Sequence, residues 1–200
     1  MMCNWSDLGI PEDIPTAFGI SDTAFDLGTD QEWHDGDRHF IPTTLNIWRV
    51  GDPSVREVLL SNSVLEMLAY LTLHRPRYPF LEKVGLLSFG NLPSYGQLQW
   101  TRDYFSRPQY TLLFGADPLA SLIDIRVACG LRGKSTRLRW IVEQVSIECK
   151  NQTSLFDLEK ISLFSFERTF GLRSGVRTRK PSKHPSFLEQ LRSIAADKVR

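Results

Sequence analysis

The sequence predicts an α+β fold, in which a mainly antiparallel sheet packs against two or three helices and flexible tails extend from both ends. Three observations point to this class. Several short segments alternate apolar and polar residues, as half-buried strands do. One longer segment, residues 55–73, spaces its apolar residues as an amphipathic helix does. Acidic residues dominate the N-terminus, whereas basic residues dominate the C-terminus.

The bulk composition suits one domain with a sizeable core. The chain has 200 residues, of which 42% are hydrophobic. Three cysteines, Cys3, Cys129 and Cys149, form no C-x-x-C pair, which indicates unpaired thiols in a reducing compartment. We find no apolar core of a signal peptide and no apolar run of membrane-spanning length, so we expect a protein without either segment.

The charges are divided along the chain. Residues 1–37 carry nine acids and no Lys or Arg, which leaves 14 acids and 24 bases in the remaining residues, a net charge of +10. We therefore expect an acidic, disordered tail over residues 1–39, a core domain over residues 40–170 and a basic tail over residues 171–200. Alternatively, the acidic segment folds onto a partner or onto the protein's own basic surface. The basic part predicts an anionic partner.

The first half of the core is expected to contain one strand and a helical region. Residues 40–50 are rich in β-branched and aromatic residues and predict a strand. Residues 55–73 predict a helix capped by Asp52 or Ser54, or two short helices interrupted at residues 61–63. Residues 81–89 are apolar and fit either a helix or a strand, and a loop rich in glycine and proline follows them.

The second half predicts further strands. Residues 98–104, 110–114 and 121–129 alternate as strands do, and residues 121–129 would form one arm of a basic hairpin. The other arm, residues 136–149, changes its alternation near residue 143, which predicts a bulge; a helix is also compatible with its spacing. Helical starts are predicted after Ser154 and over residues 187–199.

One segment matches the permissive form of a phosphate-binding loop. Ala128 is followed after four residues by Gly133, Lys134 and Ser135, and an apolar, strand-like segment precedes them. The remaining chain offers no later apolar strand that ends in an acid suited to hold magnesium. We therefore favour a charged hairpin whose bases contact phosphates or lipid headgroups, or are simply solvated.

The predicted site is thus an electrostatic surface. No Ser-His-Asp or Cys-His arrangement is visible, and we predict no catalytic residue, no metal and no cofactor. The mixed His and Asp segment 34–39 has metal-ligand residue types but favours a polar linker. The predicted contacts with a membrane surface or nucleic acid are Arg126, Arg132, Lys134, Arg137, Arg139, Arg173, Arg177, Arg179, Lys180 and Lys183.

Residues 81–114, LEKVGLLSFGNLPSYGQLQWTRDYFSRPQYTLLF, and residues 122–131, LIDIRVACGL, resemble the matrix proteins of rhabdoviruses. The resemblance implies a non-enzymatic viral structural protein that self-associates, binds the inner face of the host membrane and condenses the nucleocapsid RNA in the host cytoplasm and virion. Tyr78, Pro79 and Leu81 match a YPxL-type budding motif for host machinery. The acidic N-terminus departs from the basic arm found in parts of that family.

Two alternatives remain beside this resemblance. One is a basic nucleic-acid-binding protein of another family, and the other is a nucleotide hydrolase that uses the loop at residues 128–135. The alternatives differ in the partner that the basic residues would meet. All three share the expectation that the bases contact phosphate groups, so binding should weaken as salt rises.

Overall fold

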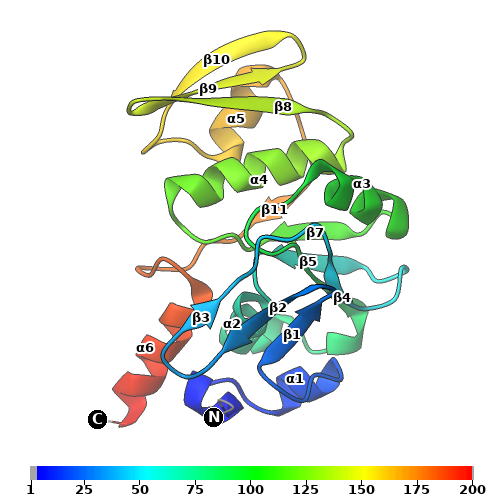
Figure 1. The fold of residues 1–200 in the computed structure, drawn as a ribbon, viewed down its shortest axis with the longest axis vertical. Coiled ribbons are helices and arrows are strands. Elements are labelled where there is room, and N and C mark those ends of the chain that lie inside the picture. The colour runs from blue at the N-terminus through cyan, green and yellow to red at the C-terminus, as the bar shows by residue number, and fades with distance from the viewer. Residues whose placement is uncertain (1–3, 200) are drawn as a thin grey trace.

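The structure, a computed structural model, describes residues 4–199 and confirms the predicted α+β class. Its centre is a five-stranded sheet with the strand order β11-β7-β5-β6-β4. The connections between strands cover both faces of this sheet with helices, which gives the layered arrangement in Figure 1. The strands span Trp48–Val50 (β4), Glu57–Ser61 (β5), Val84–Ser88 (β6), Gln109–Leu112 (β7) and Arg177–Thr178 (β11).

The central sheet is mainly parallel, although antiparallel pairings prevail in the molecule as a whole. β5 pairs in parallel with β6 and β7, β7 pairs in parallel with β11, and only β4 runs antiparallel to its neighbour β6. β6 is buried at every position, so its sequence lacks the alternation that marks a half-exposed strand. Two antiparallel sheets flank the centre: Ala24–Leu27 (β1), Asp30–His34 (β2) and His39–Phe40 (β3); and Thr136–Ile141 (β8), Gln144–Cys149 (β9) and Gln152–Asp157 (β10).

The helices form layers on either side of the central sheet. One face is covered by α2, α1, α6 and the β1–β3 sheet, and the other face by α3 and α4. A further layer of α5 and the β8–β10 sheet packs on the outer side of α4, at the top of Figure 1. The helices span Asp13–Ala17 (α1), Val64–Leu73 (α2), Tyr95–Tyr104 (α3), Pro118–Leu131 (α4), Leu163–Phe170 (α5) and Phe187–Val199 (α6).

The predicted disorder of residues 1–39 is wrong for the described part, residues 4–39. This segment forms a short 3-10 helix (Trp5–Leu8), α1 and the β1–β3 sheet. Its isolated apolar side chains, including Ile14 and Phe25, are buried in the same core as α2. The prediction of disorder rests on the many acidic residues of this segment. The segment folds nevertheless, because its few apolar side chains are buried against α2 and the central sheet.

Glu32 on β2 fixes this N-terminal segment to the core. Its carboxylate is fully buried at the N-terminus of α2, where it accepts hydrogen bonds from the Ser63 hydroxyl at 2.6 Å and the Val64 amide at 2.9 Å. His39 Nε2 lies 3.1 Å from the same carboxylate. The first turn of a helix leaves amides without backbone partners, so a carboxylate placed there is strongly held.

A second buried carboxylate fixes the C-terminal segment. Glu66 on α2 accepts a hydrogen bond from the Phe187 amide at 2.7 Å, at the start of α6. Burial raises the pKa of Glu66 above its usual value. Residues 171–200 were predicted to be a flexible basic tail, but β11 joins the central sheet and α6 packs against α2 through Phe187 and Leu191. Within this C-terminal segment, only the helix over residues 187–199 was predicted correctly.

The predicted strand at residues 121–129 is the middle of α4. Asp117 caps this helix by accepting a hydrogen bond from the Ala120 amide at 2.8 Å. One side of α4 packs on the central sheet through Ile123, and another side packs on the β8–β10 layer through Ile125. Because α4 is buried on both sides, its polar face is almost absent and no helical period is visible in the sequence.

The remaining expectations are corrected in the same way. Residues 98–104 lie in α3, which begins with a capping box between Ser94 and Gln97. The predicted helix at residues 55–73 is instead β5 followed by α2, and the predicted strand at residues 40–50 is reduced to β4 and the end of β3. Residues 136–149 are strands, as favoured, but form a complete hairpin with a turn at residues 142–143 in place of a bulge. The helix predicted to start after Ser154 is absent there, and this segment continues β10.

Candidate anion-binding site

A cavity of about 440 Å³ lies beside the N-terminal end of β7, between α3, the end of α4 and the segment that leads into β11. Three arginine side chains, Arg102, Arg107 and Arg132, line it. They come from three separate parts of the chain, which the fold brings together. We refer to this cavity as the arginine pocket. Arg132 was among the predicted contacts, whereas the sequence offered no signal that would connect it with Arg102 and Arg107.

Arg102 lies on α3 and reaches the turn that follows α4. A β-carbon added to Gly133 would stand 2.5 Å from Nη1 of Arg102, so the guanidinium lies directly against this glycine. Gly133 also has a positive φ of 66°, a conformation that glycine adopts easily. Among residues 4–199, the only carboxylate paired with Arg102 is the exposed Asp103, and an exposed ion pair of this kind holds the guanidinium weakly.

Arg107 enters the cavity from the connection between α3 and β7. Its backbone has a φ of 57°, which is uncommon for a residue other than glycine. Such backbone strain persists only where the surrounding structure holds it, and it is often found at functional sites. Within residues 4–199, no carboxylate lies within ion-pair distance of the Arg107 guanidinium.

Arg132 is the C-cap residue of α4 and reaches across to the segment before β11. Its Nε donates a hydrogen bond to the carbonyl of Ser174. A β-carbon on Gly175 would stand 2.6 Å from Nη2 of Arg132, so this guanidinium also lies against a glycine. The bond to Ser174 uses one of the five N–H groups of the guanidinium and fixes its direction.

The rest of the pocket wall is apolar or neutral. Phe105 and Leu131 are buried beneath the arginines, and Val176 is half-buried beside them. The Tyr110 hydroxyl donates a hydrogen bond to the Thr101 carbonyl, and burial raises the Tyr110 pKa to about 12, so this group stays neutral. The pocket therefore combines three positive charges with an apolar floor, a setting in which guanidinium groups bind phosphate or carboxylate through paired hydrogen bonds.

The lining differs in composition from that of most acid–base catalytic sites. The residues that line the pocket include no His, Cys, Asp or Glu, the side chains that most often transfer protons in catalysis. The hydroxyl of Ser174 donates to the Glu167 carboxylate, which lies outside the pocket lining. The arginines of the pocket can hold an anion.

The predicted phosphate-binding loop is contradicted by the fold. Such a loop needs a strand before it and a helix N-terminus behind it. Here Ala128 lies inside α4, and Gly133, Lys134 and Ser135 connect the C-terminus of that helix to β8. The Lys134 amide donates to the Cys129 carbonyl, so the turn closes the helix. The turn therefore lies at the opposite end of its helix from the amides that a phosphate-binding loop presents.

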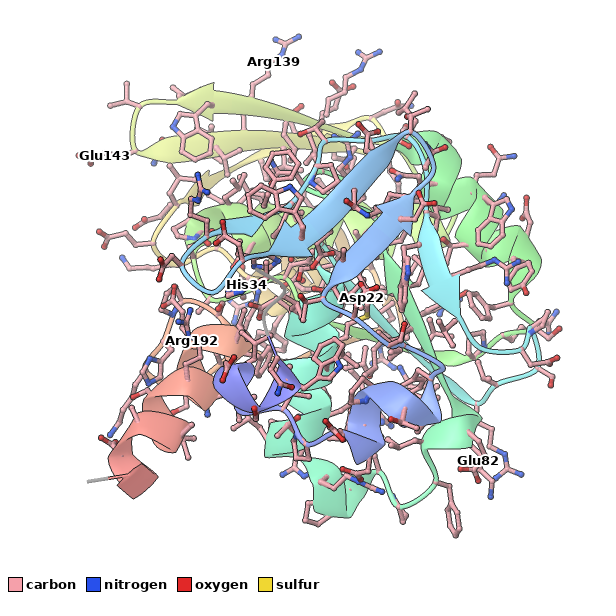
Figure 2. The ribbon with its side chains drawn as sticks, turned by 60° about the horizontal axis from the view of Figure 1, so that its bottom comes forward. Asp22, His34, Glu82, Arg139, Glu143 and Arg192 are labelled. Atoms are coloured by element: carbon pink, nitrogen blue, oxygen red, sulfur yellow. The ribbon has the colours of Figure 1, made fainter. Side chains whose placement is uncertain are left out.

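The other predicted basic contacts are dispersed over the molecule. Arg137 and Arg139 project from the outer face of β8, and Figure 2 shows Arg139 and Glu143 pointing away from the molecule. Lys180 forms an ion pair at 2.7 Å with the buried Asp124 and is therefore structural. Lys134 and Arg173 line a narrow crevice beside α5, Arg126 lines a separate open hollow, and Arg177, Arg179 and Lys183 are exposed along and beyond β11.

Two further predictions concern buried side chains. Tyr78 and Leu81 of the proposed budding motif are buried in the core, and the Tyr78 hydroxyl lies 3.1 Å from that of Tyr70. A partner could not reach these two side chains in the folded protein, although Pro79 is exposed. Cys129 and Cys149 are buried, and burial raises the Cys129 pKa to about 12. A thiol of that pKa is a poor nucleophile.

The C-terminal edge of a parallel sheet is the usual place for a ligand, where neighbouring strands connect in opposite directions. Here that point lies between β5, which leads to β6, and β7, which leads to β11. Its polar groups already have partners within the protein. The Ser61 hydroxyl donates to the Leu113 carbonyl, Asp117 caps α4, and Glu32 occupies the N-terminus of α2. The arginine pocket is therefore the better candidate site.

No protein family, no curated protein and no solved structure matches this chain in the comparisons with known proteins. The resemblance to matrix proteins accordingly stays a prediction from the sequence. No helix within residues 4–199 has the length and apolar character needed to cross a bilayer. In the same part of the chain, His, Cys, Asp and Glu side chains form no group of three that would suit a metal ion.

Proposed function

We propose that the protein is a non-enzymatic nucleic-acid-binding protein, which holds phosphate groups of single-stranded RNA or DNA in the arginine pocket. The observation that carries this proposal is the convergence of Arg102, Arg107 and Arg132 on one cavity with an exposed carboxylate at a single arginine. Guanidinium groups fit phosphate oxygens in pairs, and nucleic acid is the commonest polymer of phosphates that such groups meet.

The exposed side of α3 supports the choice of single strands. Trp100 and Tyr104 stack on one another with ring centroids 4.6 Å apart. The Arg49 guanidinium lies over both rings, at 5.6 Å from Trp100 and 4.5 Å from Tyr104. Aromatic and arginine side chains that are grouped in this way offer stacking surfaces to unpaired bases. The same helix carries Arg102 about half a turn around its axis from these rings, so a strand that reached both sites would cross α3.

Membrane-surface binding, as in the matrix-like proposal, is a second candidate that one observation favours. Trp140, Ile141 and Val142 are exposed at the end of the β8–β9 hairpin, and Arg139 lies next to them. Apolar and aromatic side chains beside a base are suited to the interface of an anionic bilayer. Self-association, a nucleocapsid partner and a place on the inner membrane face or in the virion belong to this candidate.

Fluorescence anisotropy with labelled single-stranded oligonucleotides tests the proposal. We expect replacement of Arg102, Arg107 or Arg132 by Ala to weaken binding about tenfold each at low salt, because each loses a charge-assisted hydrogen bond. Arg192→Ala is the matched control, since it removes one exposed charge from α6, far from the pocket and near His34 in Figure 2.

The salt dependence adds a second measurement to the same experiment. The magnitude of the slope of log affinity against log salt should decrease by about one in each pocket variant. It should stay unchanged in a variant whose replaced base does not contact a phosphate. If no oligonucleotide binds at low salt, or if all three pocket variants bind as the wild type does, the proposal is wrong. If instead the protein floats with anionic liposomes and Trp140→Ser abolishes flotation, the membrane candidate is favoured.

A further inference from the structure

We infer that the arginine pocket receives the terminal phosphate of a strand, a phosphate monoester on a single nucleotide, in preference to the phosphodiesters inside the strand. This inference rests on the proposed function and adds the class of ligand to it. It follows from three features of the pocket: its size and shape, the number of positive charges without acidic partners, and the nature of its walls.

The size and shape suit one nucleotide. A volume of about 440 Å³ is typical of pockets for small molecules. Phe105 and Leu131 are only 4% and 5% exposed, so the apolar core closes the cavity from below. The apolar floor limits how deeply a strand can enter. A compact pocket of this size holds one phosphate with its nucleotide, whereas a run of internal phosphodiesters needs a longer groove.

The charges favour a monoester. A phosphate monoester carries a charge close to −2 at neutral pH, because its second pKa is about 6, whereas each internal phosphodiester carries −1. Arg107 and Arg132 have no carboxylate within ion-pair distance among residues 4–199. Asp103 offsets Arg102 only weakly at the exposed rim. Two to three unopposed guanidinium groups thus match a dianion better than a single negative charge.

The positions of the guanidinium groups are set by the fold. Arg102 lies against Gly133 and Arg132 lies against Gly175, so two arginines are held at the two segments that border the cavity. The Ser174 carbonyl fixes the direction of the Arg132 side chain. Groups that are oriented before the ligand arrives lose less freedom on binding, which increases affinity.

The remaining wall suits the sugar and base of the terminal nucleotide. Pro108, Tyr110 and Val176 line the cavity and are half-buried, so they present apolar surface toward its mouth. Aromatic and apolar side chains stack on bases without regard to sequence. We therefore expect the pocket to distinguish a phosphorylated end from a hydroxyl end more strongly than it distinguishes one base from another.

The test compares one oligonucleotide sequence in three forms, with a 5′-phosphate, a 3′-phosphate or hydroxyl groups at both ends. We expect the wild type to bind one phosphorylated form about tenfold more tightly than the hydroxyl form. The preference should disappear in Arg107→Ala and Arg107→Gly and persist in Arg192→Ala. A nucleoside monophosphate should compete for the pocket, whereas the corresponding nucleoside should not.

Arg107→Gly is the control that separates a loss of binding at the pocket from a loss caused by misfolding. Glycine adopts the positive φ of 57° at this position without strain, so this variant should unfold at the same or a higher urea concentration than the wild type. A preference that is lost in a variant with intact stability is then a direct effect on the pocket.

The outcomes separate this inference from the proposed function. If oligonucleotide binding needs the three arginines but does not change with end phosphorylation, the inference is wrong and the proposed function stands. If a nucleoside monophosphate binds in an Arg107-dependent way while no oligonucleotide binds, the pocket takes a phosphate monoester and the nucleic-acid function is wrong. If inorganic phosphate competes as well as the nucleoside monophosphate, the walls contribute nothing and the nucleotide part of the inference is overturned.

Discussion

Asp124 shows how single buried residues determine the pH dependence of this protein. It is 1% exposed on α4, its Oδ2 pairs with Lys180 at 2.7 Å, and its Oδ1 has no hydrogen-bond partner within residues 4–199. Burial raises the Asp124 pKa to about 6, although the Lys180 ammonium acts in the opposite direction. The folded protein therefore binds a proton at Asp124 more tightly than the unfolded chain, whose Asp pKa is about 3.9.

The free energy of unfolding should consequently decrease between about pH 4 and pH 6, as the proton that the folded state holds more tightly is lost. We expect Asp124→Asn to lack this contribution, so that the variant gains stability relative to the wild type as pH rises through this window and the difference stays constant above about pH 7. Urea unfolding at several pH values measures this difference in the free energy of unfolding between the variant and the wild type. A difference that does not change with pH would contradict the assignment.

Lys180→Met provides a matched variant for the same experiment. Removing the ammonium leaves the Asp124 carboxylate buried without its partner, so the Asp124 pKa should rise further. The window in which stability decreases should then move to higher pH, and the variant should be less stable than the wild type at neutral pH. This result would also confirm that Lys180, which the sequence suggested as a contact for an anionic partner, has a structural role.

At the scale of the elements, two carboxylates connect three parts of the chain. Glu32 on β2 caps α2, and Glu66 on α2 caps α6. We expect Glu32→Ala and Glu66→Ala each to lower the free energy of unfolding by about 2–4 kcal/mol, since each leaves buried amides unpaired. Glu32→Gln keeps an accepting oxygen and should lose less. Replacement of the exposed Glu12 by Ala is the control, and urea unfolding is the measurement.

Equal losses in the free energy of unfolding for Glu12→Ala and Glu32→Ala would show that the buried carboxylate at the start of α2 does not stabilise the fold. Limited proteolysis adds a local readout. In the Glu32 variant, cleavage should increase within residues 24–40 before the rest of the chain is cut, because this carboxylate joins the β1–β3 sheet to α2. In the Glu66 variant, cleavage should increase around residues 180–187, where the chain enters α6.

Among the elements that sequence patterns predicted correctly, β8, β9 and α6 each have one exposed face, whereas β7, predicted over residues 110–114, is a strand of the central sheet. β8 and β9 belong to an outer sheet, and α6 lies on the surface, so their apolar residues recur with the period of the element. α4 and β6 are enclosed on both sides, and a uniformly apolar segment carries no period. Ser63 and Asp117, which cap α2 and α4, were the local signals that could have located these helices.

The candidate site was less predictable than the fold. Arg132 could be selected from the sequence because it lies in a basic segment, but its neighbours Arg102 and Arg107 belong to a segment with no excess of charge. The pocket arises because α3 and α4 pack on the same face of the sheet and β11 joins its edge. Such a juxtaposition depends on the strand order of the sheet, which periodicity does not reveal.

At the scale of the whole molecule, residues 4–39 are part of the core and not an appendage. Within residues 4–39, large apolar side chains are buried on the face that α2 presents, and the β1–β3 sheet covers the same side (Figure 1). These side chains are Trp5, Leu8, Ile10, Ile14, Phe18 and Phe25. Burial of each contributes roughly 1.5–3 kcal/mol before the entropy cost of ordering the segment, so their removal takes away a large part of the apolar burial in this core.

A chain that begins at residue 40 should therefore fail to fold cooperatively, in contrast to the complete protein. Removal of the segment exposes the outer side of α2, leaves its first amides without Glu32 and uncovers apolar surface that promotes aggregation. Urea unfolding followed by far-UV circular dichroism and tryptophan fluorescence measures the cooperativity. A disordered acidic tail would have the opposite consequence: the chain from residue 40 would keep the unfolding midpoint of the full protein, and the core would then lie entirely within residues 40–199.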